Sequence, residues 1–167
     1  VKGWGPERHI YFRAVFSKPF DGFMIYQDKK PVIYNTSRFR SNREAWGPGL
    51  MFTANFKTHS GEQVCVRTSI SATGPDGTVV NMRELNGLSF DEVRQRAVEM
   101  WNKELSRYTV SGDDEQKATF YTSAYHAALC PFIYDDADGK YLALDKSVQH
   151  EDGFTNLTEF SLWDTYR

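Results

Sequence analysis

The chain has 167 residues, enough for one domain of ordinary size or for a piece of something larger. Twenty basic and twenty-two acidic residues leave a formal net charge of −2 and form no basic run longer than two, so we expect no nucleic-acid partner. No apolar stretch approaches the roughly 18 residues that cross a bilayer, and the first residues contain no signal-peptide core, so we expect no membrane span. Because only Cys65 and Cys130 are present, apolar packing must stabilise the fold in place of disulfides or a cysteine zinc cage.

The first half of the chain shows the two-residue alternation of half-buried strands. Four runs have this pattern or a short continuous apolar version of it: residues 9–17, 22–26, 50–57 and 63–70. Turn-forming sequences separate the runs, and Gly74-Pro75-Asp76-Gly77 follows the last of them. The sequence therefore predicts antiparallel strands joined by hairpins.

After Asn86-Gly87 the apolar spacing becomes that of a helix. Ser89 and Glu92 have the spacing of a capping box, in which each side chain accepts a hydrogen bond from the other residue's backbone N–H. Apolar side chains then recur at three- and four-residue steps as far as Leu105, with charged residues between them. This pattern predicts a helix from Ser89 to Leu105 that packs by one side only.

A second helix is expected from Asp113 to Leu129. Acidic residues at its start complement the helix dipole, and Pro131 follows its end. Its apolar side chains surround the axis almost completely, which is typical of a helix buried on most sides. One other helix and a small sheet offer too little surface to bury it, so we expect the polypeptide to be incomplete.

The acidic segment Asp135–Gly139 has the composition of a calcium loop but not its spacing. With Gly139 at the central position, the first ligand would be Tyr134 and the last would be Asp145 in place of the usual glutamate. A polar turn before the strand-like residues 141–144 is the favoured interpretation.

None of the four histidines stands at metal-ligand spacing from another. His126, in the second helix, is more typical of a core histidine than of a base, and His150 is more typical of a solvated loop. The motifs of acyl and phosphoryl transfer are also absent from the sequence. The residues therefore indicate no catalytic group and no metal ligand in this chain.

The terminal hexapeptide Leu162–Arg167 has the most specific composition. A sugar pocket needs a carboxylate for two adjacent hydroxyls, a flat ring for the apolar face of the sugar and often a cation. Asp164, Trp163 and Arg167 supply these three groups. The alternative is a helix start with Trp163 in the core and Asp164 paired with Arg167, and composition alone favours that alternative slightly.

Four stretches together closely resemble glycoside hydrolase family 92, the bacterial exo-acting α-mannosidases. They are Leu85–Leu105, Glu115–Leu129, Asp138–Tyr141 and Phe160–Arg167. The Ser-Leu-Trp-Asp-Thr-Tyr-Arg string after the Tyr125-His126 helix is highly specific. The resemblance covers roughly the second half of the chain, and the β half agrees with the family only in type.

The resemblance implies an α+β chain in which antiparallel β-sandwich strands are followed by helices that begin an (α/α)6 barrel. Residues 1–85 would be the C-terminal part of the sandwich, residues 86–112 a linker helix and its connection, and residues 113–167 the first part of the catalytic barrel. The remainder of the barrel would then be the partner that covers the second helix.

Members of this family hydrolyse terminal α-mannose from glycans with inversion, using a glutamic general acid, an aspartate general base and a calcium ion. Inversion needs two carboxyl groups about 6.5 to 9.5 Å apart, with room for the attacking water. In the family's order these groups and the calcium ligands follow the Trp-Asp-Thr string. The resemblance thus implies a chain that is inactive alone and that contributes Trp163, Asp164 and, less securely, Arg167 to the mannose pocket.

The resemblance further implies a periplasmic or secreted bacterial enzyme that takes part in N-glycan degradation. The rival interpretation is a stand-alone β-sandwich module that binds carbohydrate or another partner without catalysis. A closed apolar core would favour the module, whereas an open apolar surface would favour the enzyme fragment.

Overall fold

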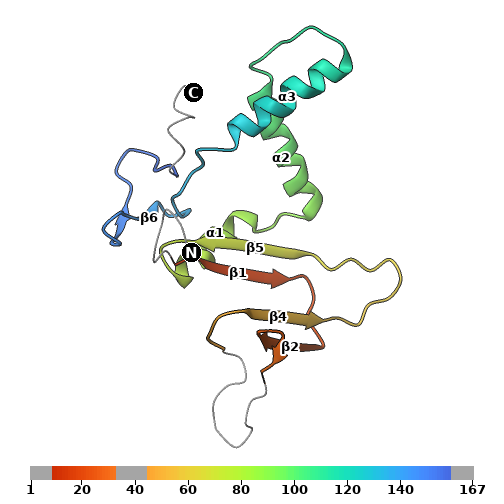
Figure 1. Cartoon of the computed structure of the whole chain (residues 1–167), viewed down its shortest axis with the longest axis vertical. Helices are drawn as coiled ribbons and strands as arrows, with labels where there is room; N and C mark the ends of the chain where they lie inside the picture. The colour runs from red at the N-terminus through yellow and green to blue at the C-terminus, as the bar shows by residue number, and fades with distance from the viewer. Residues whose placement is uncertain (1–8, 33–44, 159–167) are drawn as a thin grey trace, which may run out of the picture. The chain divides into compact units, whose positions relative to one another are not determined.

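The computed structural model describes residues 9–32 and 45–158 of the chain (Figure 1). These residues form antiparallel sheets and three α-helices, so the α+β class expected from the sequence is confirmed. The chain divides into two compact units, Val15–Val66 and the combination of Val1–Ala14 with Arg67–Arg167. The domain boundaries expected at residues 85 and 112 stay predictions.

The unit formed by Val15–Val66 is built on a three-stranded antiparallel sheet. Its strands are β2 (Gly22–Gln27), β3 (Lys30–Pro31) and β4 (Leu50–Asn55), in the order β3-β2-β4. Asp28 and Lys29 form the turn between β2 and β3 with φ angles of 49° and 66°. Positive φ angles at both positions give the twist that a two-residue hairpin requires.

Five phenylalanines form the apolar cluster of this unit. They are Phe16, Phe20, Phe23, Phe52 and Phe56. Phe23 and Phe52 stack with ring centres 5.9 Å apart, and Phe20 meets both rings edge-on, a geometry that aromatic pairs prefer. The cluster remains open, because Phe20 is 39% exposed and Phe52 is 50% exposed.

The first strand, β1 (Tyr11–Phe16), pairs with β5 (Val66–Ser71) in a two-stranded sheet. The sequence predicted these strands to within three residues, but it assumed that each strand pairs with its neighbour in the chain. Turn signals are local, whereas the pairing of β1 with β5 is set by tertiary structure, so the sequence does not show it.

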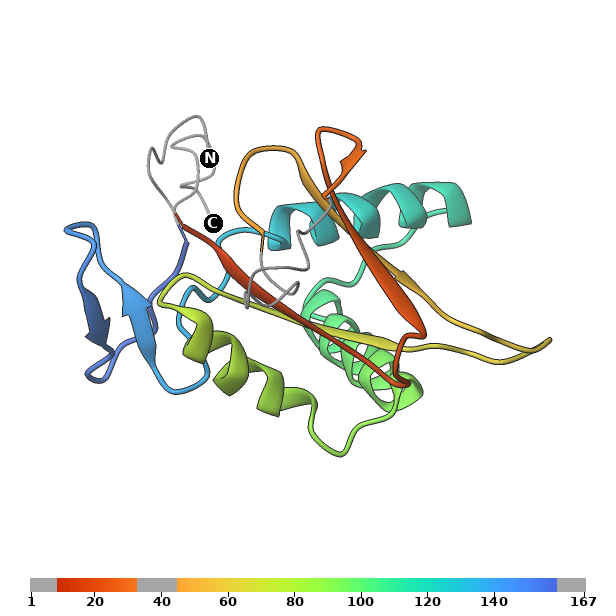
Figure 2. The ribbon, with the colours of Figure 1, turned by 90° about the horizontal axis from the view of Figure 1, so that it is seen from below.

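Helix α1 (Pro75–Met82) follows β5 and runs alongside it in both ribbon views (Figure 1 and Figure 2). The Ser69 hydroxyl donates to the Thr78 carbonyl at 2.7 Å and holds the two elements together. The sequence predicted only a turn at Gly74–Gly77, and that prediction was wrong. Proline, aspartate and glycine favour turns, but proline is equally suited to the first position of a helix, which Pro75 occupies here.

Helix α2 (Phe90–Leu105) confirms the first predicted helix. Ser89 is its N-cap, and the capping box with Glu92 is complete: the Glu92 backbone N–H donates to the Ser89 hydroxyl at 3.3 Å, and the Ser89 N–H donates to the Glu92 carboxylate at 2.7 Å. Gly87, just before the cap, has a φ of 75° that favours glycine.

Helix α3 (Asp114–Ala128) confirms the second predicted helix. Asp113 caps it through a second capping box, with Gln116. Trp101 of α2 packs on Tyr125 of α3 with ring centres 4.4 Å apart, and the Tyr121 hydroxyl donates to the Tyr108 carbonyl.

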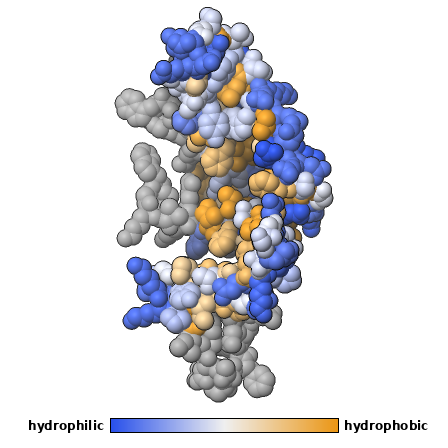
Figure 3. All heavy atoms as spheres, turned by 90° about the vertical axis from the view of Figure 1, so that its right-hand side faces the viewer, coloured by the Kyte–Doolittle hydropathy of each residue, from blue (hydrophilic) through white to orange (hydrophobic). Residues whose placement is uncertain are grey.

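The described residues leave the apolar faces of α3 uncovered, in agreement with the expectation that one other helix and a small sheet offer too little surface to bury it. No residue of α3 is buried: Phe120 is 38% exposed, and His126, predicted as a core histidine, is exposed. Across residues 9–32 and 45–158 no apolar side chain is fully buried, and hydrophobic residues reach the surface among hydrophilic ones (Figure 3). Among the described residues, no helix is long and apolar enough to span a membrane.

The last described segment contains a short hairpin of β6 (Lys140–Leu142) and β7 (Val148–His150). The polar turn predicted before it is confirmed, because Gly139 has a φ of 80° and donates its N–H to the Asp136 carbonyl. His150 is exposed, as predicted.

Candidate functional site

The three residues predicted to bind sugar, Trp163, Asp164 and Arg167, lie outside the described residues. The described part of the chain ends at Thr158, five positions before Trp163. The structure therefore shows what holds the segment that leads into the predicted sugar-binding string.

That segment pairs with residues 132–135. Thr158 and Phe132 are joined twice, because the Thr158 N–H donates to the Phe132 carbonyl at 2.8 Å and the Phe132 N–H donates to the Thr158 hydroxyl at 3.1 Å. Ile133 and Leu157 form an antiparallel bridge. The Tyr134 N–H donates to the carbonyl of residue 156 at 2.9 Å, which completes a short ladder between 132–135 and 156–158.

Asp135 adds a side-chain contact to this ladder. Its Oδ2 accepts a hydrogen bond from the Asn156 backbone N–H at 2.9 Å. Its Oδ1 is buried and has no hydrogen-bond partner among the described residues. A buried acceptor of this kind usually has a partner, so this oxygen is available to a donor from elsewhere in the protein.

Asp136, the next residue, is only 5% exposed and is the centre of a hydrogen-bonded network. Its Oδ2 accepts from the hydroxyls of Ser71, at 2.8 Å, and of Thr73. Its Oδ1 accepts from the side-chain amide of Asn81 at 2.6 Å. We call these four residues the Asp136 network. A buried carboxylate is stable only when it is well hydrogen-bonded, and three neutral donors meet that need here.

The network joins three parts of the chain: the end of β5, helix α1 and the loop before β6. Asn81 connects the loop to β5. Its side-chain amide also donates to the Ile70 carbonyl, and its side-chain oxygen accepts from the Ala137 N–H at 2.7 Å. Gly77 leaves the space that the network fills. A Cβ on Gly77 would overlap the Ser71 hydroxyl and the Asp136 carboxylate.

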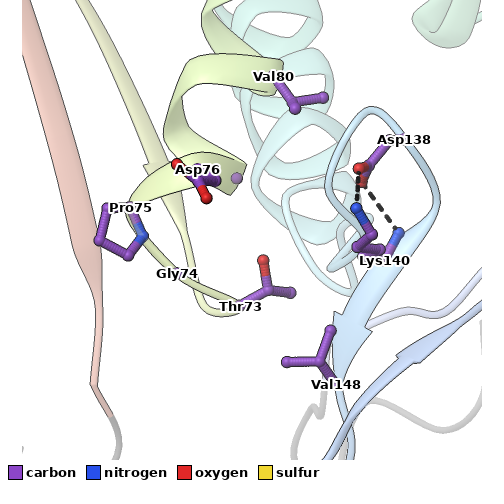
Figure 4. A pocket seen from close by; sticks show the side chains of 9 residues that line it. Thr73, Gly74, Pro75, Asp76, Val80, Asp138, Lys140 and Val148 are labelled. Carbon is purple, nitrogen blue, oxygen red and sulfur yellow. Dashed lines mark hydrogen bonds and ion pairs between the residues drawn. The ribbon is translucent and has the colours of Figure 1, made fainter.

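A cavity of about 300 Å³ lies beside the network (Figure 4). It is lined by Thr73, Gly74, Pro75, Asp76, Gly77, Val80, Asp138, Lys140 and Val148. Asp138 and Lys140 form an ion pair at 2.6 Å in its wall. The hydrogen bond between them lowers the pKa of Asp138 and raises that of Lys140, so both groups are charged at neutral pH.

This arrangement is suited to holding chain segments and not to bond cleavage. The Asp136 carboxylate is saturated by its donors and Asp138 is paired with a lysine, so neither is free to act as a general base. Within residues 9–32 and 45–158, no three potential ligands come close enough to hold a metal ion. The described residues therefore do not fit the calcium ion that the resemblance implies.

Comparison with known proteins identifies the family. The sequence profile of the "Glycosyl hydrolase family 92 catalytic domain" matches residues 79–167, more than half of the chain. The chain belongs to glycoside hydrolase family 92. The match begins inside α1, so the Asp136 network connects residues on both sides of that boundary. A comparison with curated proteins found no match.

Solved structures of the same family are similar to the chain. The family GH92 alpha-mannosidase BT3965 of Bacteroides thetaiotaomicron is 59% identical, with a TM-score of 0.91 over 99% of this chain and 22% of that protein. The same enzyme in complex with mannoimidazole gives a TM-score of 0.90 over the same shares of both chains. The family GH92 inverting mannosidase BT2199 of Bacteroides thetaiotaomicron VPI-5482 is 25% identical, with a TM-score of 0.72 over 95% of this chain and 21% of that protein. The chain thus spans about a fifth of the length of these relatives.

Sequence reasoning missed the Asp136 network, and its prediction of a sugar-binding string around Trp163 lies outside the described residues and stays a prediction. It interpreted Asp135–Gly139 as a polar turn, and the turn is real. The sequence does not indicate the hydrogen-bond partners of Asp136, because one of them, Ser71, is 65 residues away along the chain.

Proposed function

We propose that the protein containing this chain is an exo-acting α-mannosidase that removes terminal α-mannose from glycans. The observation that carries the proposal is the 59% identity, over 99% of the chain, to an enzyme described as an alpha-mannosidase. The binding of mannoimidazole by that enzyme supports a mannose-like ligand.

The proposed stereochemical outcome is inversion, supported by similarity to a relative described as an inverting mannosidase. Inversion needs a general acid and a general base about 6.5 to 9.5 Å apart, so that a water molecule fits between the base and the sugar. In the proposal these are a glutamate and an aspartate outside this chain. The 167 residues alone would then lack both groups and be inactive.

In the proposal, Asp164 binds two adjacent hydroxyls of the mannose, Trp163 forms the wall beside the ring, and Arg167 lies nearby. A carboxylate forms strong charge-assisted hydrogen bonds with hydroxyls, and the sugar must be held in its reactive geometry for them to assist the reaction. The acid–base step would be carried out by other residues.

A calcium ion is part of the proposal, and its ligands would come from the rest of the barrel, since the described residues contain no suitable group of three. By resemblance to the family we also propose a bacterial enzyme that acts on N-glycans in the periplasm or outside the cell.

The open apolar surfaces support an enzyme fragment over a self-contained binding module. A module that folds alone needs an apolar core, and none of the described apolar side chains is fully buried. The phenylalanine cluster and helix α3 would be covered by the remainder of the enzyme.

The test is hydrolysis by the full-length protein. We expect it to release the aryl group from an aryl α-mannoside and to leave an aryl β-mannoside and an aryl α-glucoside intact. Absence of α-mannoside hydrolysis with calcium present, by a protein that is demonstrably folded, would contradict the proposal.

A further inference from the structure

We propose that the Asp136 network is a lock that joins the catalytic domain to the strand region before it. The part of the chain that matches the catalytic domain begins at residue 79, so Asn81 and Asp136 lie inside it. The other two members of the network, Ser71 and Thr73, lie before it. The lock would make the end of β5 and the loop before β6 open together and not separately. This proposal goes beyond the proposed function, and its test needs no enzyme activity.

The network occupies the best-buried place in the described part of the chain. Within residues 9–32 and 45–158 five residues are buried, and all of them lie in the three segments that the network joins: Ser71, Gly77, Thr78, Asp136 and Gly139. Ser71 and Asp136 are each only 5% exposed. A polar group that loses its hydrogen-bond partner here does not simply gain water in its place, so the loss is costly.

Each side of the domain boundary completes the hydrogen bonding of the other side. Asp136 receives two of its three side-chain donors, the hydroxyls of Ser71 and Thr73, from the strand region. The Ser71 hydroxyl also accepts from the Thr73 N–H at 3.0 Å, so the turn after β5 depends on the same group. Without the end of β5, the Asp136 carboxylate would keep only the Asn81 amide. Because a buried carboxylate with one donor is strongly disfavoured, we infer that the two segments open as one unit.

Asn81 connects strand and loop a second time. Its side-chain amide donates to the Ile70 carbonyl of β5 and to the Asp136 carboxylate, and its side-chain oxygen accepts from the Ala137 N–H. One residue of α1 thus holds both segments at once. In agreement with this, Arg67–Arg167 belongs to a single compact unit, although the family boundary lies inside it.

The alternative is that the loop before β6 holds itself and that the network adds little. The turn in this loop is closed by a hydrogen bond from the Gly139 N–H to the Asp136 carbonyl, and the ion pair between Asp138 and Lys140 is also local. If these local bonds are sufficient, removal of a hydroxyl on β5 will leave the loop unchanged. The two interpretations therefore predict different results for a change on β5.

The experiment is native-state hydrogen exchange on the full-length protein carrying Ser71→Ala. Exchange is followed in the peptide that covers residues 136–141, which lies inside the matched catalytic domain. Thr73→Val is a second variant, which removes the other hydroxyl on the strand side with little change in shape. It keeps the test decisive if Ser71→Ala does not fold.

Ser69→Ala is the matched control. Ser69 lies on the same strand and the same face as Ser71, but its hydroxyl donates to the Thr78 carbonyl and not to Asp136. The substitution is identical and removes one hydroxyl from β5 without removing a member of the network. Peptides from β4 are a second control, because this strand belongs to the other compact unit.

We expect Ser71→Ala and Thr73→Val each to raise exchange at 136–141 at least about tenfold, because a hydrogen bond to a charged group contributes at least that factor to a local opening equilibrium. Exchange in β4 should stay within about twofold of the wild type, and Ser69→Ala should change 136–141 by no more than about twofold. Unchanged exchange at 136–141 in the folded variants would overturn the proposal, since the loop would then hold itself. An equal rise in β4, or an equal rise at 136–141 in Ser69→Ala, would also overturn it, because the effect would then be a general loosening.

Discussion

Replacing Gly77 by alanine should loosen helix α1, although alanine is normally the better helix residue. In a helix interior, glycine is about 1 kcal/mol less favourable than alanine, so an unobstructed exchange would stabilise α1. Gly77 is obstructed. A Cβ there would overlap the Ser71 hydroxyl and the Asp136 carboxylate and would lie 2.8 Å from the Thr73 hydroxyl.

The loss of stability in Gly77→Ala can be estimated from the hydrogen bond that the added Cβ would displace. Loss of one hydrogen bond to the Asp136 carboxylate costs about 2 kcal/mol, because such bonds to charged groups contribute about 1.5 to 3 kcal/mol. Overpacking adds roughly 1 kcal/mol at the low end of its usual range, and the higher helix propensity of alanine recovers about as much. We therefore expect a net local destabilisation of about 2 kcal/mol.

The assay is native-state hydrogen exchange at residues 79–82 in the full-length protein. A loss of about 2 kcal/mol corresponds to roughly 30-fold weaker protection when the helix opens locally. Gly74→Ser is the control, because it adds a side chain in the same turn where nothing lies within 4 Å, and serine suits an N-cap position. Equal or stronger protection in Gly77→Ala would refute the account of the Asp136 network.

Three further predictions concern the capping box, the isolated chain and the sugar site. Ser89→Ala should destabilise α2 by about 1 kcal/mol, whereas Ser106→Ala at the other end of the helix should not. Hydrogen bonds from the Ser89 N–H and hydroxyl lower the pKa of Glu92, so the capping contribution should be complete above pH 4.5 and lost as the pH falls through the lowered pKa. Hydrogen exchange in α2 at several pH values measures this loss. The 167-residue chain purified alone should release no mannose from an aryl α-mannoside with or without calcium, and calcium-dependent turnover above the buffer blank would show this to be wrong. Asp164→Ala in the full-length enzyme should lower kcat/KM by orders of magnitude with little change in Tm, whereas near-normal kinetics with a lowered Tm would assign Asp164 to a helix start.

Local signals explain what could be predicted from the sequence. The box formed by Ser89 and Glu92 placed the start of α2 at the correct residue, because both partners lie within one helical turn. The apolar patterns of consecutive residues located β1, β2, β4 and β5 to within a few residues, because these patterns are also local. The same local logic failed at Pro75, where the residue types of a turn and of a helix N-terminus coincide.

What could not be predicted depends on residues far apart in the sequence. The burial of Asp136 is visible only when Ser71, Thr73 and Asn81 are brought to it by the fold. The sequence predicted that the other elements would leave α3 uncovered, but it could not show what covers this helix, because an apolar pattern reports what a helix is suited to contact and not which part of the polypeptide supplies the contact. The sugar-binding role of the string around Asp164 could be predicted, though it stays untested, because its residue types are consecutive in the sequence.

The proposed enzyme activity is tested most directly by following the anomeric protons of mannose during hydrolysis of an aryl α-mannoside by the full-length protein. Proton NMR distinguishes α-mannose from β-mannose before the two interconvert. An inverting exo-α-mannosidase must produce β-mannose first, with α-mannose appearing only later by mutarotation. Early accumulation of α-mannose, or no release of mannose at all, would contradict the account.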